Sequence, residues 1–348
     1  MAISTRSTLS NPSQLLLKND DLLSATSALL VNCPDPEFCR QMQSLNPDAL
    51  ISAFNVNFAE HQQIANVANI NAQFSEYYQT EKQHDLIIIY FPKSKHEYIY
   101  LLSMLASVLH KDGLVLVVGD NKGGVKSSQK LATKLTKDYQ KLDSARHCSL
   151  FSCTFAENIA QFSLQDWVSS FAIEFAGQTL QIQYLPGVFS RGELDKGTAL
   201  LLNNLPSSMH GTILDFGCGA GVIGAAIASR YPDTDVHMLD VNAMALASAR
   251  MTLEANGLKG KVFASDGLSH VSQQYQYVVS NPPFHQGIKT HYATTETFLT
   301  DIRKFIHGKG QLTIVANSFL KYPPILKQHF KHYELKATGQ GFSIHHCD

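Results

Sequence analysis

A short stretch near the C-terminus, SNPPF at residues 280–284, has residue types that can hold a planar amino group. The side-chain oxygen of Asn281 and the backbone carbonyl of Pro282 are acceptors, so together they can accept from both N–H groups of an exocyclic amine. Such bonding favours a tetrahedral nitrogen with a directed lone pair. The paired prolines fix the direction of that carbonyl, and Phe284 can stack on a base. The stretch therefore predicts group transfer to a base amino group, although it also suits an ordinary strand end.

A second stretch, ILDFGCGAGVIG at residues 213–224, joins an apolar strand to a helix through a glycine-rich turn. The first glycines of this turn are Gly217, Gly219 and Gly221. They let backbone N–H groups approach a ligand at a helix N-terminus. Residues 219–224 also fit the GxGxxG pattern of nicotinamide dehydrogenases, which is one hypothesis. Asp215 argues against it, because a carboxylate there is poorly placed for a pyrophosphate and better placed for an ammonium group.

Two further acids end the strands that follow the turn, and they favour S-adenosylmethionine as the ligand. Asp240 ends the next predicted strand, and the two oxygens of a carboxylate match the cis-diol of a ribose. Asp266 ends the strand after that and can accept from an adenine amino group. Asn242, two residues beyond Asp240, completes the predicted cofactor contacts. With Asp215 facing the amino-acid end, the series matches the whole cofactor.

The alternation of short apolar strands and helical stretches over residues 212–348 predicts a parallel sheet with helices on its faces. The first half has the same rhythm, since HDLIIIYFPKSK at 84–95 resembles YQYVVSNPPFHQ at 275–286. We therefore predict an α/β protein built from two tandem Rossmann-like domains that arose by duplication. The predicted domains are 1–175, which is degenerate, and 176–348, which carries the motifs.

The composition excludes several classes of protein. Of 348 residues, 44% are hydrophobic, which is enough for two cores, and the net charge of −1 argues against indiscriminate coating of nucleic acid. The six cysteines form no CxxC pair, so we expect free thiols and no metal site. His345 and His346 have no third ligand at suitable spacing. No segment reads as a signal peptide or a membrane span, which predicts a cytoplasmic protein without a membrane partner.

Taken together, the motifs are similar to those of a known family. The stretches LPGVFSRGELDKGTALLL (185–202) and QLTIVANSFLKYP (311–323), with the glycine turn, Asp240 and SNPPF, resemble the bacterial small-subunit rRNA guanine-N2 methyltransferases of the RsmC type. The resemblance is strong over 180–335 and weaker in the first half. A sister group that acts on large-subunit rRNA shares VFS, NPPF and VAN. Its relatives usually lack the leading LPG and the YP after VAN, which favours the small-subunit enzyme.

The resemblance implies two tandem class I methyltransferase domains, of which only the second binds S-adenosylmethionine. It implies methylation of guanine 1207 of 16S rRNA at N2, with the assembled 30S subunit as substrate and the protein acting as a monomer. The residues that fall on general methyltransferase motifs are Asp215, Gly217, Gly219, Asp240, Asp266 and Asn281. In the GVFS…LD stretch, the resemblance implies that Asp195 and Gly197 contact the cofactor and that Phe189 and Ser190 contact the substrate.

The first half lacks the residues that this chemistry needs. LLVNCPDPEFCR at 29–40 has no glycine turn, and YFPK at 90–93 has no asparagine. This half is therefore either a scaffold or an RNA-docking domain. Docking is suggested by six lysines, of which the last four have spacings that would place them on one helix face: Lys122, Lys126, Lys130, Lys134, Lys137 and Lys141.

A target base inside a paired helix would have to be extruded from it.

Four alternatives remain from the sequence alone. The NPPF motif also serves N6-adenine and protein-glutamine methyltransferases, although the GVFS stretch argues against both. The protein could act on large-subunit rRNA, or it could be a non-catalytic ribosome-assembly binder that keeps the fold. A nicotinamide dehydrogenase is the fourth alternative.

Overall fold

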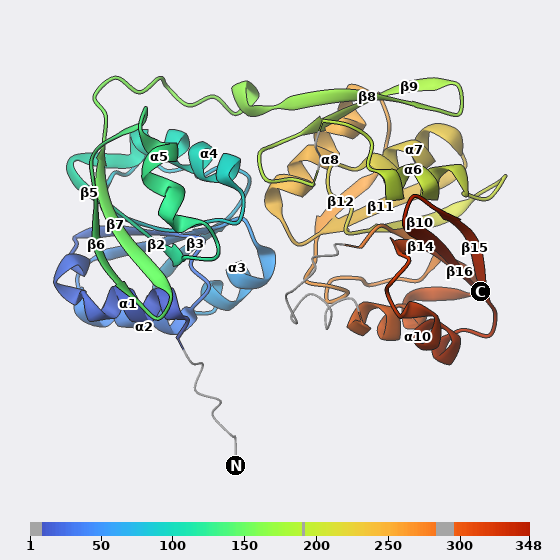
Figure 1. Cartoon of the computed structure of the whole chain (residues 1–348), viewed down its shortest axis with the longest axis horizontal. Coiled ribbons are helices and arrows are strands. Elements are labelled where there is room, and N and C mark those ends of the chain that lie inside the picture. Colours follow the sequence, from blue (N-terminus) through green and yellow to red (C-terminus); the bar gives the residue numbers. More distant parts are fainter. Residues whose placement is uncertain (1–8, 190–191, 283–295) are drawn as a thin grey trace, which may run out of the picture. The chain divides into compact units, whose positions relative to one another are not determined.

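The computed structural model describes residues 9–189, 192–282 and 296–348. The chain divides into two compact units, Met1–Trp167 and Val168–Asp348 (Figure 1). Each unit contains one seven-stranded sheet with helices on both of its faces. This confirms the prediction of two tandem Rossmann-like α/β domains.

The inner strands of the first sheet have side chains buried on both faces, as expected for a sheet covered by two helical layers, whereas its two edge strands are more exposed. Its strands are β1 (Ser27–Val31), β2 (Leu50–Asn55), β3 (Ile70–Phe74), β4 (His84–Tyr90), β5 (Leu109–Asp120), β6 (Thr136–Ala145) and β7 (Cys148–Phe155). Its α-helices are α1 (Asn11–Lys18), α2 (Pro36–Leu45), α3 (Phe58–Ala65), α4 (Lys95–Leu105) and α5 (Ser128–Ala132). Leu16 of α1, Phe38 of α2 and Ile64 of α3 share one core with Leu30 of β1.

The second unit repeats this arrangement. Its sheet contains β10 (Gly211–Phe216), β11 (Thr234–Asp240), β12 (Lys261–Ala264), β13 (Tyr275–Ser280), β14 (Ile306–Asn317), β15 (Tyr333–Gly339) and β16 (Phe342–Cys347). Its helices include α6 (Lys196–Asn203), α7 (Val222–Arg230), α8 (Ala243–Ala255) and α10 (Tyr322–His329). Leu201 of α6, Ile223 of α7 and Leu253 of α8 pack in one core. Leu326 of α10 packs in the other, on the opposite face of the sheet.

The two sheets have the same strand order. It is β3-β2-β1-β4-β5-β7-β6 in the first unit and β12-β11-β10-β13-β14-β16-β15 in the second. In both, five parallel strands are followed by an antiparallel pair at one edge. This supports the predicted duplication, because a shared rhythm of strands and helices would not by itself produce the same seven-strand order twice.

A hairpin precedes the second sheet and has no counterpart before α1 in the described part of the first unit. Its strands, β8 (Ser169–Phe175) and β9 (Gln178–Tyr184), pair with each other. The chain from β9 onward lies along α8: Gln183 N–H donates to Thr252 Oγ1 at 2.9 Å, and Leu185 N–H donates to Ser248 Oγ at 3.0 Å. The hairpin thereby fixes where the GVFS stretch begins.

In the part of the chain that the structure describes, no helix is both long and apolar enough to cross a membrane.

Candidate active site

The predicted site residues of the second unit follow four parallel neighbouring strands, β12, β11, β10 and β13. The carboxyl ends of parallel strands meet at one edge of a sheet, which is where open α/β sheets bind ligands. The sheet therefore brings the glycine turn, the acids and Asn281 to a single edge.

Asn281 comes directly after β13 and is held by the start of α6. Its Nδ2 donates to Asp195 Oδ2 at 3.1 Å and to Thr198 Oγ1 at 2.9 Å. The amide nitrogen is thus committed to protein acceptors, and no described residue donates to the amide oxygen. Pro282 is buried beside it. The acceptor role that the sequence predicts for this oxygen stays a prediction.

Asp195 is also the N-cap of α6, since its Oδ2 accepts from Thr198 N–H at 3.0 Å. Gly197, in the first turn, is buried. A Cβ there would meet the Phe342 ring at 3.0 Å and Asp195 Oδ2 at 3.1 Å. Gly197 therefore lets α6 lie against β16 and leaves room for the capping carboxylate. The cofactor contact predicted for these two residues stays a prediction, and their observed contacts are with the protein itself.

Asp215 lies next to the end of β10 and is completely buried. Its Oδ2 accepts from Gly224 N–H in the first turn of α7 at 2.9 Å. Its Oδ1 is buried and has no partner among the described residues. Burial raises the pKa of this carboxyl to about 7, and the charge of Asp240 adds to the rise. A buried, unsatisfied carboxylate oxygen is costly, so the site favours a positively charged or donating ligand group.

Asp240 ends β11 with both oxygens already oriented by backbone. Its Oδ2 accepts from Gly219 N–H at 3.0 Å, and its Oδ1 accepts from Asn242 N–H at 3.0 Å. Burial raises the pKa of Asp240 despite the lowering effect of these bonds. Each oxygen keeps a second lone pair for a hydroxyl. The Asn242 side chain caps α8 by accepting from Met244 N–H at 2.8 Å, so its oxygen is engaged in the helix start.

The backbone conformation and close packing of the turn require glycine at several of its positions. Gly217 and Gly219 have φ values of 69° and 53°, which disfavour side chains. A Cβ on Gly219 would meet nothing within 4 Å, so this glycine leaves an open cradle beside Asp240. At Gly221, by contrast, a Cβ would meet Ala249 at 3.0 Å, which shows that close packing of α7 on α8 requires the glycine. With the unpartnered Asp215 oxygen, these features fit S-adenosylmethionine.

Asp266 is exposed two residues beyond β12, and Phe189 is 64% exposed. Ser190 and Phe284, which the sequence predicts as substrate contacts, lie outside the described residues. All six cysteines are free, as predicted. Among residues 9–189, 192–282 and 296–348, no group of His, Cys, Asp or Glu side chains could hold a metal ion.

The prediction of a single lysine-bearing helix is wrong. Lys126 lies in a short 3₁₀ helix (Val125–Ser127), Lys130 in α5, and Lys134 in the turn that follows. Lys137 and Lys141 lie in β6. The helical spacing arises by chance, because β6 contains irregularities that shift its register against β7. All five side chains are nevertheless exposed. They belong to the first unit.

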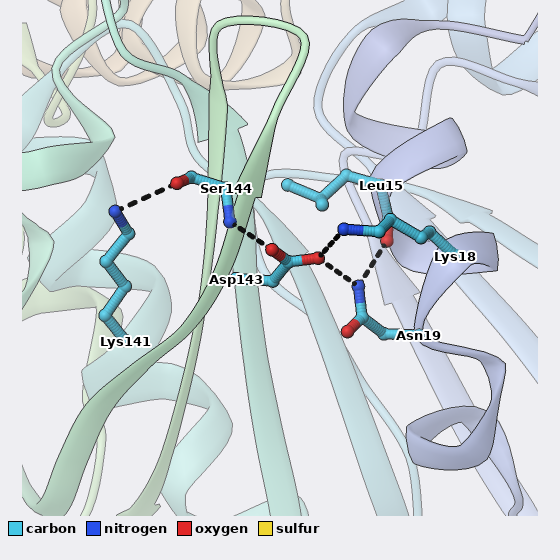
Figure 2. Close-up of polar contacts among 6 residues, drawn as sticks. All are labelled: Leu15, Lys18, Asn19, Lys141, Asp143 and Ser144. Carbon is cyan, nitrogen blue, oxygen red and sulfur yellow. Dashed lines mark hydrogen bonds and ion pairs between the residues drawn. The ribbon is translucent and has the colours of Figure 1, made fainter.

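The lysines of this segment differ in whether an acidic side chain pairs with them. Asp143 Oδ2 accepts from Lys18 Nζ at 2.8 Å and from Asn19 Nδ2 at 3.0 Å, which lowers the pKa of Asp143 to about 2 (Figure 2). Lys141 instead donates to Ser144 Oγ at 3.1 Å (Figure 2). Lys137 pairs with Glu157, and both partners are exposed. Asp143 therefore ties β6 to the C-terminus of α1 and is not the partner of Lys141.

Two residues near the site were missed at the sequence level. Thr198 holds the Asn281 amide, and its position three residues after the Asp195 cap is the signal that could have drawn attention to it. Phe319 lies two residues beyond the end of β14, the strand that neighbours β13, and its side chain is 61% exposed. Its place in VANSF was used for the resemblance, but no contact was assigned to it.

The comparisons with known proteins agree with this geometry. Residues 179–346 match the family model described as methyltransferase small domain, and residues 13–171 match its N-terminal counterpart. Ribosomal RNA small subunit methyltransferase C of Colwellia psychrerythraea is 46% identical over 97% of both chains, and that of Pseudoalteromonas translucida is 38% identical over 97% of this chain and 99% of the relative.

A solved structure shares the fold of the whole chain. It is the T. thermophilus 16S rRNA N2 G1207 methyltransferase in complex with AdoMet and guanosine. The TM-score is 0.80 at 20% identity, over 94% of this chain and 91% of that one. With relatives of this identity and coverage, the chain belongs to the ribosomal RNA small subunit methyltransferase C family.

Proposed function

We propose that this protein transfers the methyl group of S-adenosylmethionine to the exocyclic N2 of guanine 1207 in 16S rRNA. Membership in the family supports the reaction, because its relatives carry the name ribosomal RNA small subunit methyltransferase C. The observation that carries the chemistry is the orientation of Asn281, whose Nδ2 is tied to Asp195 and Thr198. That leaves its oxygen to accept from the guanine amino group.

The residues of the chain have distinct roles in this reaction. The Asn281 oxygen and the Pro282 carbonyl accept from the two amino hydrogens, which directs the nitrogen lone pair out of the ring plane. We assign to Asp240 the task of accepting from the ribose hydroxyls and to Asp215 that of facing the ammonium group. When bound, S-adenosylmethionine supplies a methyl group already activated on a sulfonium. The protein therefore contributes mainly alignment of the attacking nitrogen.

The exposed aromatic rings of Phe189 and Phe319 support a nucleic-acid substrate, because bases stack on aromatic side chains. Ser190 and Phe284 are proposed as further substrate contacts. The lysines Lys126, Lys130 and Lys134 are exposed in the first unit and are proposed to contact rRNA phosphates. We further propose the assembled 30S subunit as the substrate, a monomeric enzyme and a cytoplasmic location. The free cysteines fit a reducing compartment.

The test is methyl transfer from labelled S-adenosylmethionine to small subunits that lack the modification, followed by digestion to nucleosides. One N2-methylguanosine per subunit is expected, and mapping then decides whether it lies at guanine 1207. N6-methyladenosine, or transfer to large subunits only, would overturn the assignment. Binding of S-adenosylmethionine without any product would point to a non-catalytic binder. A thermal shift produced by NAD alone would instead favour a dehydrogenase.

A further inference from the structure

The carboxylate of Asp195 lies between the start of α6 and the side-chain amide of Asn281. One oxygen, Oδ2, accepts from Thr198 N–H at 3.0 Å and from Asn281 Nδ2 at 3.1 Å. Thr198 Oγ1 completes the arrangement at 2.9 Å from Asn281 Nδ2. We propose that Asp195 and Thr198 are positioning residues that set which way the Asn281 amide faces.

The physical argument rests on the two ends of an amide. An asparagine presents an acceptor at one end and two donors at the other, and rotating it by half a turn exchanges them. An ionised carboxylate only accepts, so the nitrogen of Asn281 must face Asp195 and the oxygen must face the substrate side. If the amide turned over, its N–H groups would oppose the amino hydrogens of the guanine. Asp195 therefore excludes an orientation that cannot bind the target.

The first unit provides a structural comparison. Its first helix, α1, is capped by Ser10, and Ser13, three residues on, contacts Tyr90 at the end of β4, with 2.6 Å between the hydroxyl oxygens. A hydroxyl in the first turn of this helix thus contacts the residue at the end of the fourth strand in both units. The cap residue is a serine in the first unit, where the Asp35 carboxylate accepts from Ser10 and Ser13, and an aspartate that contacts the strand-end residue itself in the second. We infer that the hydroxyl contact docks the helix, whereas the carboxylate orients the amide.

This inference rests on the proposed acceptor role of Asn281, and it assigns Asp195 a task different from direct cofactor binding. The two tasks predict different kinetics. A residue that orients the amide affects kcat at saturating cofactor and leaves the cofactor Kd unchanged. A residue that binds the cofactor changes that Kd. Asp195→Ser distinguishes both of these tasks from mere support of α6, because serine also caps helices well.

The decisive experiment exchanges the two side chains. Asp195→Asn should lower kcat at least tenfold, since an amide at position 195 could donate to Asn281 and turn the Asn281 amide over. Asn281→Asp places two carboxylates about 3 Å apart and should be at least as impaired. In the double variant D195N/N281D, the amide at 195 donates to the carboxylate at 281, which again turns an acceptor oxygen to the base. We expect its kcat to exceed that of Asn281→Asp at least tenfold.

Further variants provide the controls. Asp195→Ser should melt like the wild type but lose kcat. Thr198→Val should lower kcat several-fold, whereas Thr198→Ser, which keeps the hydroxyl, should have the kcat of the wild type. Ser94→Ala removes the N-cap of α4 in the first unit, where Ser94 Oγ accepts from Glu97 N–H at 3.3 Å, and should change only the melting temperature.

Three outcomes would contradict the inference: a double variant no more active than Asn281→Asp, a D195S enzyme with unchanged kcat, or a D195N enzyme that loses only cofactor affinity. Full activity in Asn281→Ala would instead overturn the proposed function itself, so the two failures are distinguishable.

Discussion

The second-to-last residue of the first strand of the sheet in chain order, β1 or β10, is Leu30 in the first unit and Asp215 in the second. The last residue of the neighbouring strand is Asn55 in the first unit and Asp240 in the second. At the end of the fourth strand, Tyr90 of the first unit is opposite Val118. In the second unit, Ser280 is opposite Ile314, one residue before Val315, which corresponds to Val118. The residue after Ser280, Asn281, is therefore the counterpart of Tyr90.

The replaced positions are those that the proposed chemistry uses, whereas the supporting positions are kept. Asn57 caps α3 by accepting from Ala59 N–H at 2.9 Å and Glu60 N–H at 3.2 Å. Asn242 caps α8 in the same way. Asn32 has a φ of 53° where the second unit has Gly217 at 69°. The first unit therefore retains the backbone of a cofactor site without its charged side chains.

The strongest test of this comparison is removal of the residue at the end of the fourth strand in each unit. Asn281→Ala should lower methyl transfer by about a hundredfold or more, the loss typical when a preorganised hydrogen-bonding group is removed from a reacting site. Tyr90→Phe, which removes the hydroxyl that contacts Ser13, should leave the rate unchanged and cost about 1 kcal/mol of stability. Single-turnover rates and chemical denaturation measure the two effects. A rate loss in Tyr90→Phe would show that the first unit takes part in the reaction.

Asp215→Leu copies Leu30 of the first unit into the second. We expect the dissociation constant for S-adenosylmethionine to rise at least tenfold, measured by calorimetry, because the ammonium group loses its partner.

The pH dependence of stability should change in the same variant. The native pKa of Asp215 is raised to about 7, whereas an aspartate in the unfolded chain titrates near 3.8. Between these values the native state binds the extra proton, so this residue makes stability fall as pH rises from about 4 to about 7. Asp215→Leu should flatten the melting temperature over that window. An unchanged slope would contradict the buried, protonated state.

The lysines test whether the first unit contributes more than a scaffold. Reversing charge at Lys130 and Lys134 should raise KM for 30S subunits several-fold and reduce the salt dependence of binding. Lys111→Glu is the matched control, because Lys111 is also exposed but lies near the start of β5. Equal effects at Lys111 and at the pair would favour general charge over a docking surface, and unchanged KM in the pair would remove docking.

The smallest expected effect concerns the two matched helix caps. Asn57→Ala and Asn242→Ala should each cost about 1 kcal/mol of stability, as loss of an N-cap usually does. Only Asn242→Ala should weaken S-adenosylmethionine binding, because loss of the cap loosens the start of α8, where the backbone N–H of residue 242 orients Asp240. Denaturation and calorimetry on both variants provide the comparison. Equal cofactor affinity in the two would show that Asp240 does not depend on this cap.

Much of the second unit could be predicted from sequence because its signals are local. The glycine-rich stretch at 213–224 locates β10 and the start of α7, and Asp240 marks the end of β11 as predicted. The partners of Asn281 could not be predicted, since they depend on the packing of α6, which is about 80 residues earlier in the chain. The burial of Asp215 was also hidden, because its neighbours in sequence do not show that α7 covers it.

The error at the lysines has a physical cause. Spacings of three and four match a helix, but β6 has register irregularities against β7, and Asp138 within it has a φ of 53°. Such bulges disturb the strict alternation by which a strand is recognised. The pattern therefore resembled a helix in a segment that pairs as a strand.

The hairpin before α6 has a mechanical consequence. Ser248 and Thr252 of α8 and its C-cap residue Asn256 follow one another at intervals of one turn. Their side chains accept from the backbone N–H groups of Leu185, Gln183 and Gln181, respectively. A shift by one residue would break all three contacts together, so the segment cannot slide gradually. Tension transmitted along the chain from the first unit is therefore borne by this ladder before it reaches the loop that carries Asp195. The anchored hairpin thus fixes the backbone that leads into the loop carrying Asp195.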